Sequence, residues 1–239
     1  MRRGRNQDNT IILLLVAILR HVQSLPFVPV VTLTTLAALI LLHEALPPRA
    51  ILSLAISAQD VLRLRPFSLP WLLTTLGSQL VHLDSLHLYY NSLSFLHKGT
   101  QLERPGARGP LGLALLLLLL WALTPALYVA LACLASPLLP SLFASRAVGF
   151  SGVIFGLKAV LQVEEEGHAT VGGMRVPAKL AAWAELVAIQ LVTPNASFLG
   201  HLAGILAGLL VVAAERAGLL PGRRGAGGGG RGGGEWARR

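Results

Sequence analysis

An apolar segment that extends to residue 163 opens with the sequence Gly149-Phe150-Ser151-Gly152, and a second apolar segment opens with Gly200-His201. A serine between glycines and a histidine in a neighbouring membrane helix can form a nucleophile and its base when the helices pack together. An isolated serine in a membrane helix is more often a packing residue bonded to its own backbone. Together, the two openings indicate proteolysis inside a lipid bilayer.

The composition is that of a polytopic membrane protein. Hydrophobic residues make up 54% of the 239-residue chain and charged residues 13%, against about 25% charged residues in soluble domains. The one cysteine, Cys133, has no partner, which excludes a disulfide framework or a cysteine zinc site within this chain. The formal charge of +9 is spread over short segments between apolar runs and over the C-terminal region. It therefore indicates membrane topology and no nucleic-acid partner.

Six apolar segments are expected to cross the bilayer: residues 26–42, 83–96, 110–133, 147–163, 176–192 and 197–214. An earlier run, residues 11–19, is shorter than the roughly 20 residues that a spanning helix needs. Arg20-His21 interrupts it, so we expect it at the membrane interface. Residues 43–80 contain four prolines and predict a broken loop with short helices. The fold class is therefore an all-α membrane protein with six transmembrane helices.

Three regions follow from this pattern. Residues 1–25 are expected to be a cytosolic or interfacial N-terminal segment, although Arg2, Arg3 and Arg5 leave a signal or transit peptide as an alternative. Residues 26–220 form the six-helix membrane domain. Residues 221–239 consist mostly of glycine and arginine and are expected to be disordered, since they offer almost no apolar side chains to bury.

The distribution of basic residues predicts the orientation. With six spans, both ends of the chain lie on one side of the membrane. That side receives most of the lysines and arginines, and the opposite side receives only Arg49, Arg63, Arg65 and Arg146. Basic residues concentrate in cytoplasmic segments, so both ends are expected in the cytosol. The serine and the histidine then lie together near the lumenal or extracellular end.

Glycines recur at every fourth position of the two segments that carry the serine and the histidine. They are Gly152 and Gly156 in one segment, and Gly200, Gly204 and Gly208 in the other. Such a repeat forms a groove on a helix where another backbone can approach closely. Close approach is what a serine–histidine hydrogen bond requires, although the repeat by itself indicates only tight packing.

Two polar residues share one face of the second expected span. His87 and Asn91 stand four residues apart, so they point in the same direction from a helix. Polar groups within a membrane often line a site, and they also form ordinary contacts between helices. Beside a serine and a histidine, a further role is the donation of hydrogen bonds to the oxyanion that forms when the serine attacks a carbonyl.

Neither a metal site nor an acidic third catalytic residue is expected. His82 and His87 are five residues apart, share a helix face poorly, and have no carboxylate or thiol placed to complete a metal shell. The acidic candidates are Asp84 and Glu185, and Glu185 could equally pair with a polar group on a neighbouring helix. Nothing in its spacing connects Glu185 to His201. The prediction is a serine–histidine dyad that uses no cofactor.

The order of these motifs resembles the rhomboid family of intramembrane serine proteases. The motifs are His82, His87 and Asn91, then Gly99 and Leu102-Glu103-Arg104, then Gly149-Phe150-Ser151-Gly152, then Gly200-His201 and Gly204. The resemblance is greatest to the endoplasmic-reticulum rhomboid-related proteases, through residues 183–189 and the opening Asn9-Thr10. In one position the chain departs from many rhomboids, because it has Leu62-Arg63 where they have a Trp-Arg pair.

The resemblance implies a six-helix fold with a water-filled cavity open to the lumenal or extracellular side. It implies Ser151 as the nucleophile and His201 as the general base. It also implies that His87, Asn91 and the Ser151 amide form the oxyanion hole. The expected substrates are transmembrane segments of other membrane proteins, which must unwind to expose a carbonyl.

The cellular location and the functional class of the protein both have alternatives. The resemblance implies the endoplasmic reticulum, and another organelle membrane is the alternative. A helical transporter would share the intramembrane polar residues, but it usually shows paired halves, and no internal repeat occurs here. A non-catalytic membrane-protein chaperone of the same fold would bind unstable segments without cutting them. The sequence does not indicate an oligomeric state.

Overall fold

The computed structural model describes residues 5–164 and 166–221, and their side chains from residue 9 onward. Within these residues the structure is mostly helical. The seven longer helices are α1 (Arg5–Gln23), α2 (Val30–Ala45), α6 (Ser85–Glu103), α7 (Gly109–Ala135), α9 (Ser151–Glu164), α10 (Ala181–Val192) and α11 (Phe198–Arg216). The short elements are α3 (Pro48–Ser53), α4 (Ala58–Arg63), α5 (Leu69–Thr75), α8 (Ser141–Ala144), and the 3-10 helices η1 (Gly77–Gln79) and η2 (Ala178–Leu180).

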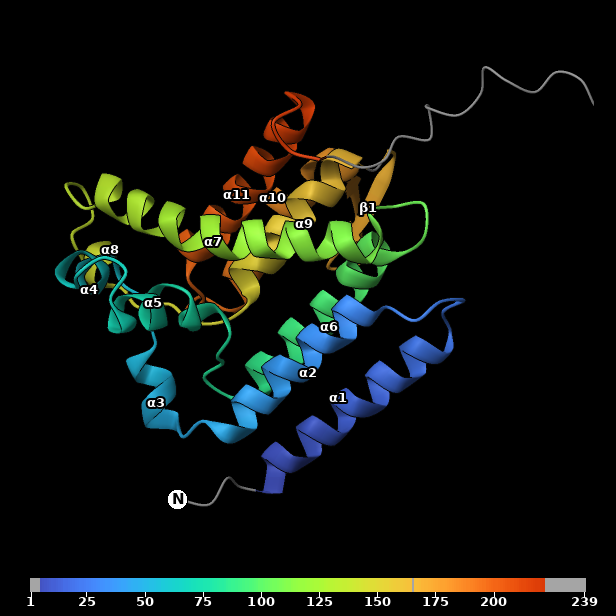
Figure 1. Ribbon diagram of the computed structural model, residues 1–239, viewed down its shortest axis with the longest axis horizontal. Helices are drawn as coiled ribbons and strands as arrows, with labels where there is room; N and C mark the ends of the chain where they lie inside the picture. Colours follow the sequence, from blue (N-terminus) through green and yellow to red (C-terminus); the bar gives the residue numbers. More distant parts are fainter. Residues whose placement is uncertain (1–4, 165, 222–239) are drawn as a thin grey trace, which may run out of the picture.

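Helix α9 lies at the centre of the molecule. It contacts α6, α7, α10 and α11, and α7 crosses it in the view of Figure 1. Ten of its 14 residues are buried, on all sides of the helix. A helix that is apolar all round is expected in such an enclosed position. The residue that begins this helix, Ser151, is therefore held by packing on several sides.

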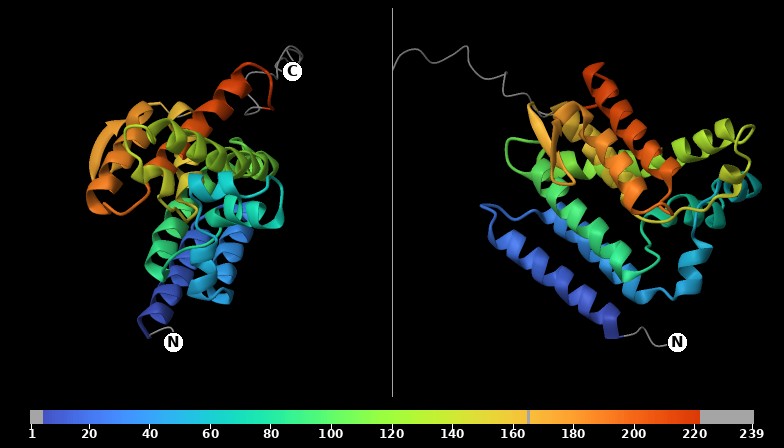
Figure 2. Two further views of the ribbon diagram at one scale, coloured as in Figure 1. Left: turned by 90° about the vertical axis from the view of Figure 1, so that its left-hand side faces the viewer. Right: turned by 180° about the vertical axis from the view of Figure 1, so that it is seen from behind.

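Helices α1, α2 and α6 form a layer on one side of α9. Figure 2 shows α1 along the outer edge of this layer, and α1 contacts α6 along its length. Arg20 and His21 lie in the last turn of α1, which ends at Gln23, and the interfacial position of this segment stays a prediction. A tertiary contact holds this end of the helix: His21 Nε2 lies 3.1 Å from Thr100 Oγ1 on α6. Its ring also lies edge to face with His97, with the ring centroids 4.7 Å apart.

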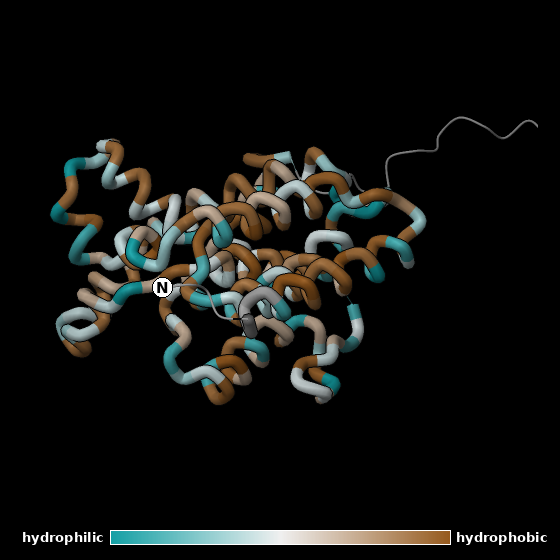
Figure 3. The backbone as a smooth tube through the Cα atoms, turned by 90° about the horizontal axis from the view of Figure 1, so that it is seen from below, coloured by the Kyte–Doolittle hydropathy of each residue, from teal (hydrophilic) through white to brown (hydrophobic). Residues whose placement is uncertain are grey.

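Two of the described helices are long and apolar enough to cross a bilayer, by length and composition. They are α7, with 27 residues, and α11, with 19 residues. Figure 3 shows hydrophobic residues along most of the helical path, with hydrophilic residues mainly near helix ends and connections. The helices in the other expected spans are shorter or more polar, so the count of six spans stays a prediction.

The segment after α9 differs from the expectation. A span was expected to begin at residue 176, but a hairpin of β1 (His168–Val171) and β2 (Met174–Pro177) occupies this part of the chain. Its turn is Gly172-Gly173, with φ angles of +57° and +82°. Two glycines with positive φ match the two-residue turn that suits the twist of antiparallel strands. The helix therefore begins only at Ala181.

The proline-rich segment between α2 and α6 contains α3, α4, α5 and η1, which confirms the expected short helices. Serine side chains begin two of them: Ser57 accepts from the Asp60 amide, and Ser68 from the Trp71 amide. These caps satisfy amides that a short helix otherwise leaves free. Ile56, just before α4, pairs through its backbone with Ala147, just before α9. This pairing brings the proline-rich segment to the edge of the site.

Candidate active site

The chain turns sharply before α9, so that Ser151 is the first helical residue. Gly149 has a φ of +115°, which side-chain-bearing residues rarely adopt. A Cβ atom at Gly149 would also lie 2.8 Å from His87 Cε1. The Gly149 amide donates to the Ser78 carbonyl at 2.9 Å. Glycine at this position therefore permits both the turn and the close approach of His87.

His201 lies in the first turns of α11, which Ser197 caps by accepting from the Gly200 amide at 3.2 Å. The Nε2 atom of His201 lies 2.9 Å from Ser151 Oγ. The imidazole stacks on Phe155 of α9, with ring centroids 4.5 Å apart and planes inclined by 26°. A nucleophilic hydroxyl and its base are expected at this separation. The structure thus brings together the serine and histidine that stand 50 residues apart in the sequence.

Glycines bring α9 and α11 into backbone contact. A Cβ atom at Gly204 would collide with the Gly152 carbonyl group, whose carbon would lie 2.7 Å away. A Cβ atom at Gly208 would likewise collide with the Gly156 carbonyl and would lie 2.9 Å from Ala159 Cβ. No flexible side chain stands in these gaps to move aside. This contact positions the two helices that carry Ser151 and His201.

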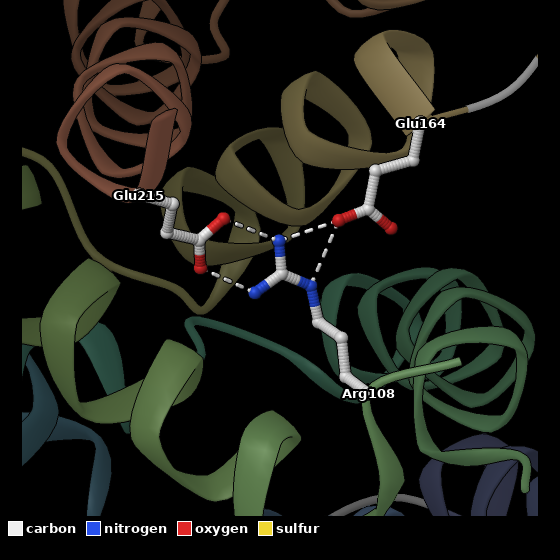
Figure 4. A network of polar contacts seen from close by, with 3 residues as sticks. All are labelled: Arg108, Glu164 and Glu215. Carbon is white, nitrogen blue, oxygen red and sulfur yellow. Dashed lines mark hydrogen bonds and ion pairs between the residues drawn. The ribbon is translucent and has the colours of Figure 1, made fainter. Parts of the chain in front are cut away.

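An arginine links the C-terminal ends of α9 and α11, which are the ends away from the dyad. Arg108, immediately before α7, donates to both Glu215 oxygens at 2.6 and 2.8 Å and to Glu164 at 3.0 Å from Nε (Figure 4). Its side chain is only 4% exposed. Burial alone would lower the pKa of Arg108, but the two glutamates outweigh it and raise that pKa. Sequence reasoning assigned Arg108 only to a cytosolic connection, since its partners lie 56 and 107 residues away.

The two acidic candidates for a third catalytic residue are engaged elsewhere. Asp84 caps α6 by accepting from the His87 amide at 2.8 Å. Glu185 forms ion pairs with Lys98 and Lys158, at 3.4 and 2.6 Å. In the described part of the chain, the buried Nδ1 atom of His201 has no hydrogen-bond partner. Stacking on Phe155 is therefore the contact that sets the plane of the imidazole.

His87 and Asn91 lie on the side of α6 that faces the turn before α9. A Cβ atom at Gly149 would be 2.9 Å from His87 Nε2 and 3.8 Å from Asn91 Nδ2. In this structure the Asn91 amide donates to the His87 carbonyl at 3.1 Å. His87 lines the cavity beside Ser151, and Asn91 is buried behind it. The Asn91 amide carries a second N–H, which can donate to a substrate while the first is bonded to the His87 carbonyl.

A cavity of about 320 Å³ opens beside the dyad. Ser151 and His201 lie in its wall with residues from several elements, which include the polar side chains Gln79, Tyr128, Arg146 and Asn195. The sequence did not single out these four, because they come from a short helix, from the middle of α7 and from two connections. Its volume lies at the lower end of the range of about 300–1,000 Å³ that is usual for ligand pockets.

His82 packs against the turn that precedes Ser151. Its buried Nε2 atom accepts from the Phe150 amide at 3.4 Å, and its ring lies edge to face with His87 at 5.1 Å. From the sequence, His82 was considered as a metal ligand and as part of the family motif, but not as a support of that turn. Within residues 5–164 and 166–221, no group of three histidine, cysteine or acidic side chains is placed to hold a metal ion.

Comparison with known proteins decides the family, because the model described as the Rhomboid domain matches residues 70–217. The chain belongs to the rhomboid family. The matched part of this rhomboid contains every residue of the site described above. Helices α1 to α4 precede the match.

Curated relatives extend the similarity. Rhomboid-related protein 4 of Homo sapiens is 36% identical over 213 residues, which cover 88% of this chain and 65% of the relative. Rhomboid-like protein 14, mitochondrial, of Arabidopsis thaliana is 41% identical over 136 residues, 56% of this chain and 40% of the relative. Rhomboid-type serine protease 2 of Eremothecium gossypii is 29% identical over 138 residues, 57% of this chain and 51% of the relative. This rhomboid thus spans less than two thirds of the length of these relatives.

Proposed function

We propose that this rhomboid is an intramembrane serine endopeptidase that cleaves transmembrane segments of membrane proteins near the lumenal face. The observation that carries the proposal is the 2.9 Å separation of Ser151 Oγ and His201 Nε2 at the wall of a cavity. A relative named as a serine protease supports it. The substrate segment must unwind locally, because a helical peptide bond is enclosed by its own hydrogen bonds.

The reaction follows from the dyad. Ser151 Oγ attacks the substrate carbonyl carbon while His201 Nε2 takes the hydroxyl proton. The protonated imidazole then gives that proton to the amine that leaves, and the carbonyl remains bound to Ser151 as an ester. Water adds to the ester carbon while His201 accepts one of its protons. The bond between that carbon and Ser151 Oγ then breaks, His201 returns the proton to Oγ, and the new carboxyl end of the substrate leaves. The dyad uses no cofactor in these steps.

We propose that His87 and Asn91, together with the Ser151 amide, donate hydrogen bonds to the oxyanion. His87 lies at the cavity wall, and the first amides of α9 point out of the helix end. The N-terminus of a helix also favours negative charge. A carbonyl oxygen placed in the cavity beside Ser151 and His87 would receive donors from both α6 and α9 as its charge develops.

Topology and location complete the proposal. We infer six spans, with both ends of the chain in the cytosol, from the distribution of basic residues. The endoplasmic reticulum is the proposed membrane. A relative named as mitochondrial makes a mitochondrial membrane the specific alternative. Partners are the substrate transmembrane segments and the surrounding lipid.

A fluorophosphonate probe, which reacts with activated serines, tests the proposal. The purified full chain in detergent is expected to be labelled at Ser151 and to cleave members of a panel of transmembrane substrates. Ser151→Ala should lose both, with a fall in cleavage of at least about 10⁴-fold. Ser53→Ala removes an exposed serine of α3 and is the matched control. Absent labelling and cleavage in the folded wild-type protein would indicate the non-catalytic chaperone instead.

A further inference from the structure

A second cavity, of about 220 Å³, lies between α6, α9 and the start of α10. Its polar lining includes Lys98, Gln101, Lys158 and Gln162, and β1 completes the wall. Lys98 follows His87 by eleven residues, which places it about 16 Å further along α6. This cavity therefore lies at the end of the helices that points away from the dyad, and the proposed protease mechanism does not use it.

Two lysines of this cavity share a single carboxylate. Glu185 Oε1 lies 3.4 Å from Lys98 Nζ, and Glu185 Oε2 lies 2.6 Å from Lys158 Nζ. The Lys98 ammonium also donates to Ser94 Oγ at 2.7 Å. The lysine side chains are only 12% and 15% exposed. Two cations and one anion leave one positive charge in a partly buried position, which is costly without a further counter-ion.

The neighbouring carboxylates are committed to other groups. Glu103, at the end of α6, accepts from the Thr32 amide and hydroxyl at the start of α2, at 2.8 and 2.7 Å. Glu164, at the end of α9, accepts from Arg108. In the described chain, the remaining charge of the two lysines therefore faces the cavity and not one of these acids.

The cavity has the chemistry of a phosphate site. Lysine ammonium groups carry several donors each, and glutamine amides add neutral donors. The first residue of α10 belongs to the wall, and the next amide, that of Ala182, donates to Gln162 Oε1 at 3.1 Å, which leaves the Gln162 amide nitrogen as a donor. Basic pockets between transmembrane helices on the cytoplasmic side hold phosphorylated lipid headgroups, and the cytoplasmic leaflet is rich in anionic lipids.

We propose that the cavity between Lys98, Lys158 and the start of α10 binds a phosphate group, supplied by the headgroup of an anionic phospholipid or by a soluble phosphate ester. The inference goes beyond the proteolytic function, and its lipid form rests on the proposed topology, which places this end of the bundle at the cytoplasmic leaflet. The bound phosphate supplies the second counter-ion of the Lys98–Glu185–Lys158 cluster and joins α6, α9 and α10.

The test is equilibrium binding of dioctanoyl phosphatidylinositol 4-phosphate to the purified full chain in uncharged detergent. Dioctanoyl phosphatidylcholine and tail-free inositol phosphate are compared under the same conditions. The phosphorylated lipid is expected to bind, with a dissociation constant raised about tenfold or more in Lys158→Gln, since one charge-assisted hydrogen bond is lost. Lys179→Gln removes an exposed lysine of η2 and should leave the dissociation constant unchanged.

A second variant keeps the buried ion pairs intact. Gln101→Glu places a carboxylate at the exposed edge of the cavity, and it should weaken binding in a protein with wild-type thermal stability. Binding of inositol phosphate as tight as that of the lipid would assign the site to soluble esters, whereas binding of the lipid alone would assign it to the membrane. Equal affinity in Lys158→Gln, Gln101→Glu and Lys179→Gln, or equal binding of phosphatidylcholine, would overturn the proposal. The readout is binding, so its failure is separate from failure of the protease assay.

Discussion

Helix α11 packs on α9 through backbone, whereas α1 packs on α6 through side chains. At the first contact, a Cβ atom on Gly204 or Gly208 would strike a carbonyl of α9. At the second, Leu14 is buried while Leu13 and Leu15 are 61% and 51% exposed. Side chains can change rotamer to absorb a substitution, but a backbone carbonyl cannot. The helices that carry the dyad are therefore confined to one arrangement, whereas side chains between α1 and α6 can repack.

The largest effect is expected from added bulk at the backbone contact. Gly204→Val should abolish measurable cleavage, because a shift of 1 Å in catalytic geometry already costs about 100-fold in rate. It should also lower the free energy of unfolding by more than about 3 kcal/mol through overpacking. The measurements are cleavage of a model transmembrane substrate and thermal unfolding in detergent.

Leu210→Val is the matched control for this prediction. Leu210 belongs to the same helix and is 51% exposed, so its truncation should change cleavage less than about twofold. Similar activity in the two variants would show that the glycine contact does not set the position of His201.

The next prediction tests whether the packing of α11 on α9 also requires the ion pairs at the C-terminal ends of the two helices. Arg108→Gln leaves the carboxylates of Glu164 and Glu215 without their partner, and removal of one member of a buried ion pair costs about 3–5 kcal/mol. The unfolding temperature should fall strongly. Arg216→Gln, an exposed arginine one residue beyond Glu215, is the control and should be nearly silent. Equal unfolding temperatures for both variants would mean that the glycines alone hold α9 against α11.

A smaller effect is expected on the inner face of α6, the helix that contacts both α9 and α1. Asn91→Ala should lower turnover by about 100-fold, or about 2.7 kcal/mol, since an oxyanion donor acts mainly in the transition state. Substrate affinity and thermal stability should change little. Steady-state kinetics separate these quantities. An unaltered turnover number would assign Asn91 to packing, consistent with its bond to the His87 carbonyl.

The smallest effect is expected on the outer face of α6. His21→Ala removes the 3.1 Å contact with Thr100 and the ring contact with His97. The Thr100 hydroxyl still donates to the Leu96 carbonyl, so the loss should be about 1 kcal/mol of stability. Cleavage at a temperature well below unfolding should equal that of the wild type. A tenfold loss of turnover would instead make α1 part of the catalytic arrangement.

Local patterns predicted most of the helical segments. Apolar stretches place α2, α7, α9 and α11 within about four residues of their observed bounds, because backbone in a membrane must satisfy its own hydrogen bonds. Helix α6 begins near its expected start but continues to Glu103, beyond the expected end at residue 96. One error has a local reason. The turn signal Gly172-Gly173 was present in the sequence just before the expected span at residues 176–192, and the hairpin and the 3-10 helix that follow it delay the helix to Ala181.

The serine, the histidine and the glycine repeats were also available from sequence, since each is unusual at membrane depth. Their spacing indicated which faces could meet. It did not give the 2.9 Å contact between Ser151 and His201 or the orientation of the Asn91 amide. The contact between Ser151 and His201 depends on how far α11 slides along α9, which the backbone contact at Gly204 limits. The Asn91 amide is oriented within α6, by its bond to the His87 carbonyl.

Local sequence patterns predict most helical segments and the residues that carry chemistry, because periodicity, chain-breaking residues and the cost of burying polar groups act over a few residues. Which charges compensate one another depends on the tertiary fold. Arg108 meets partners 56 and 107 residues away, and Glu185 meets Lys98 across 87 residues. No periodicity links such distant positions. Their pairing results from the packing of whole helices, whose close approach the glycines of α9 and α11 permit.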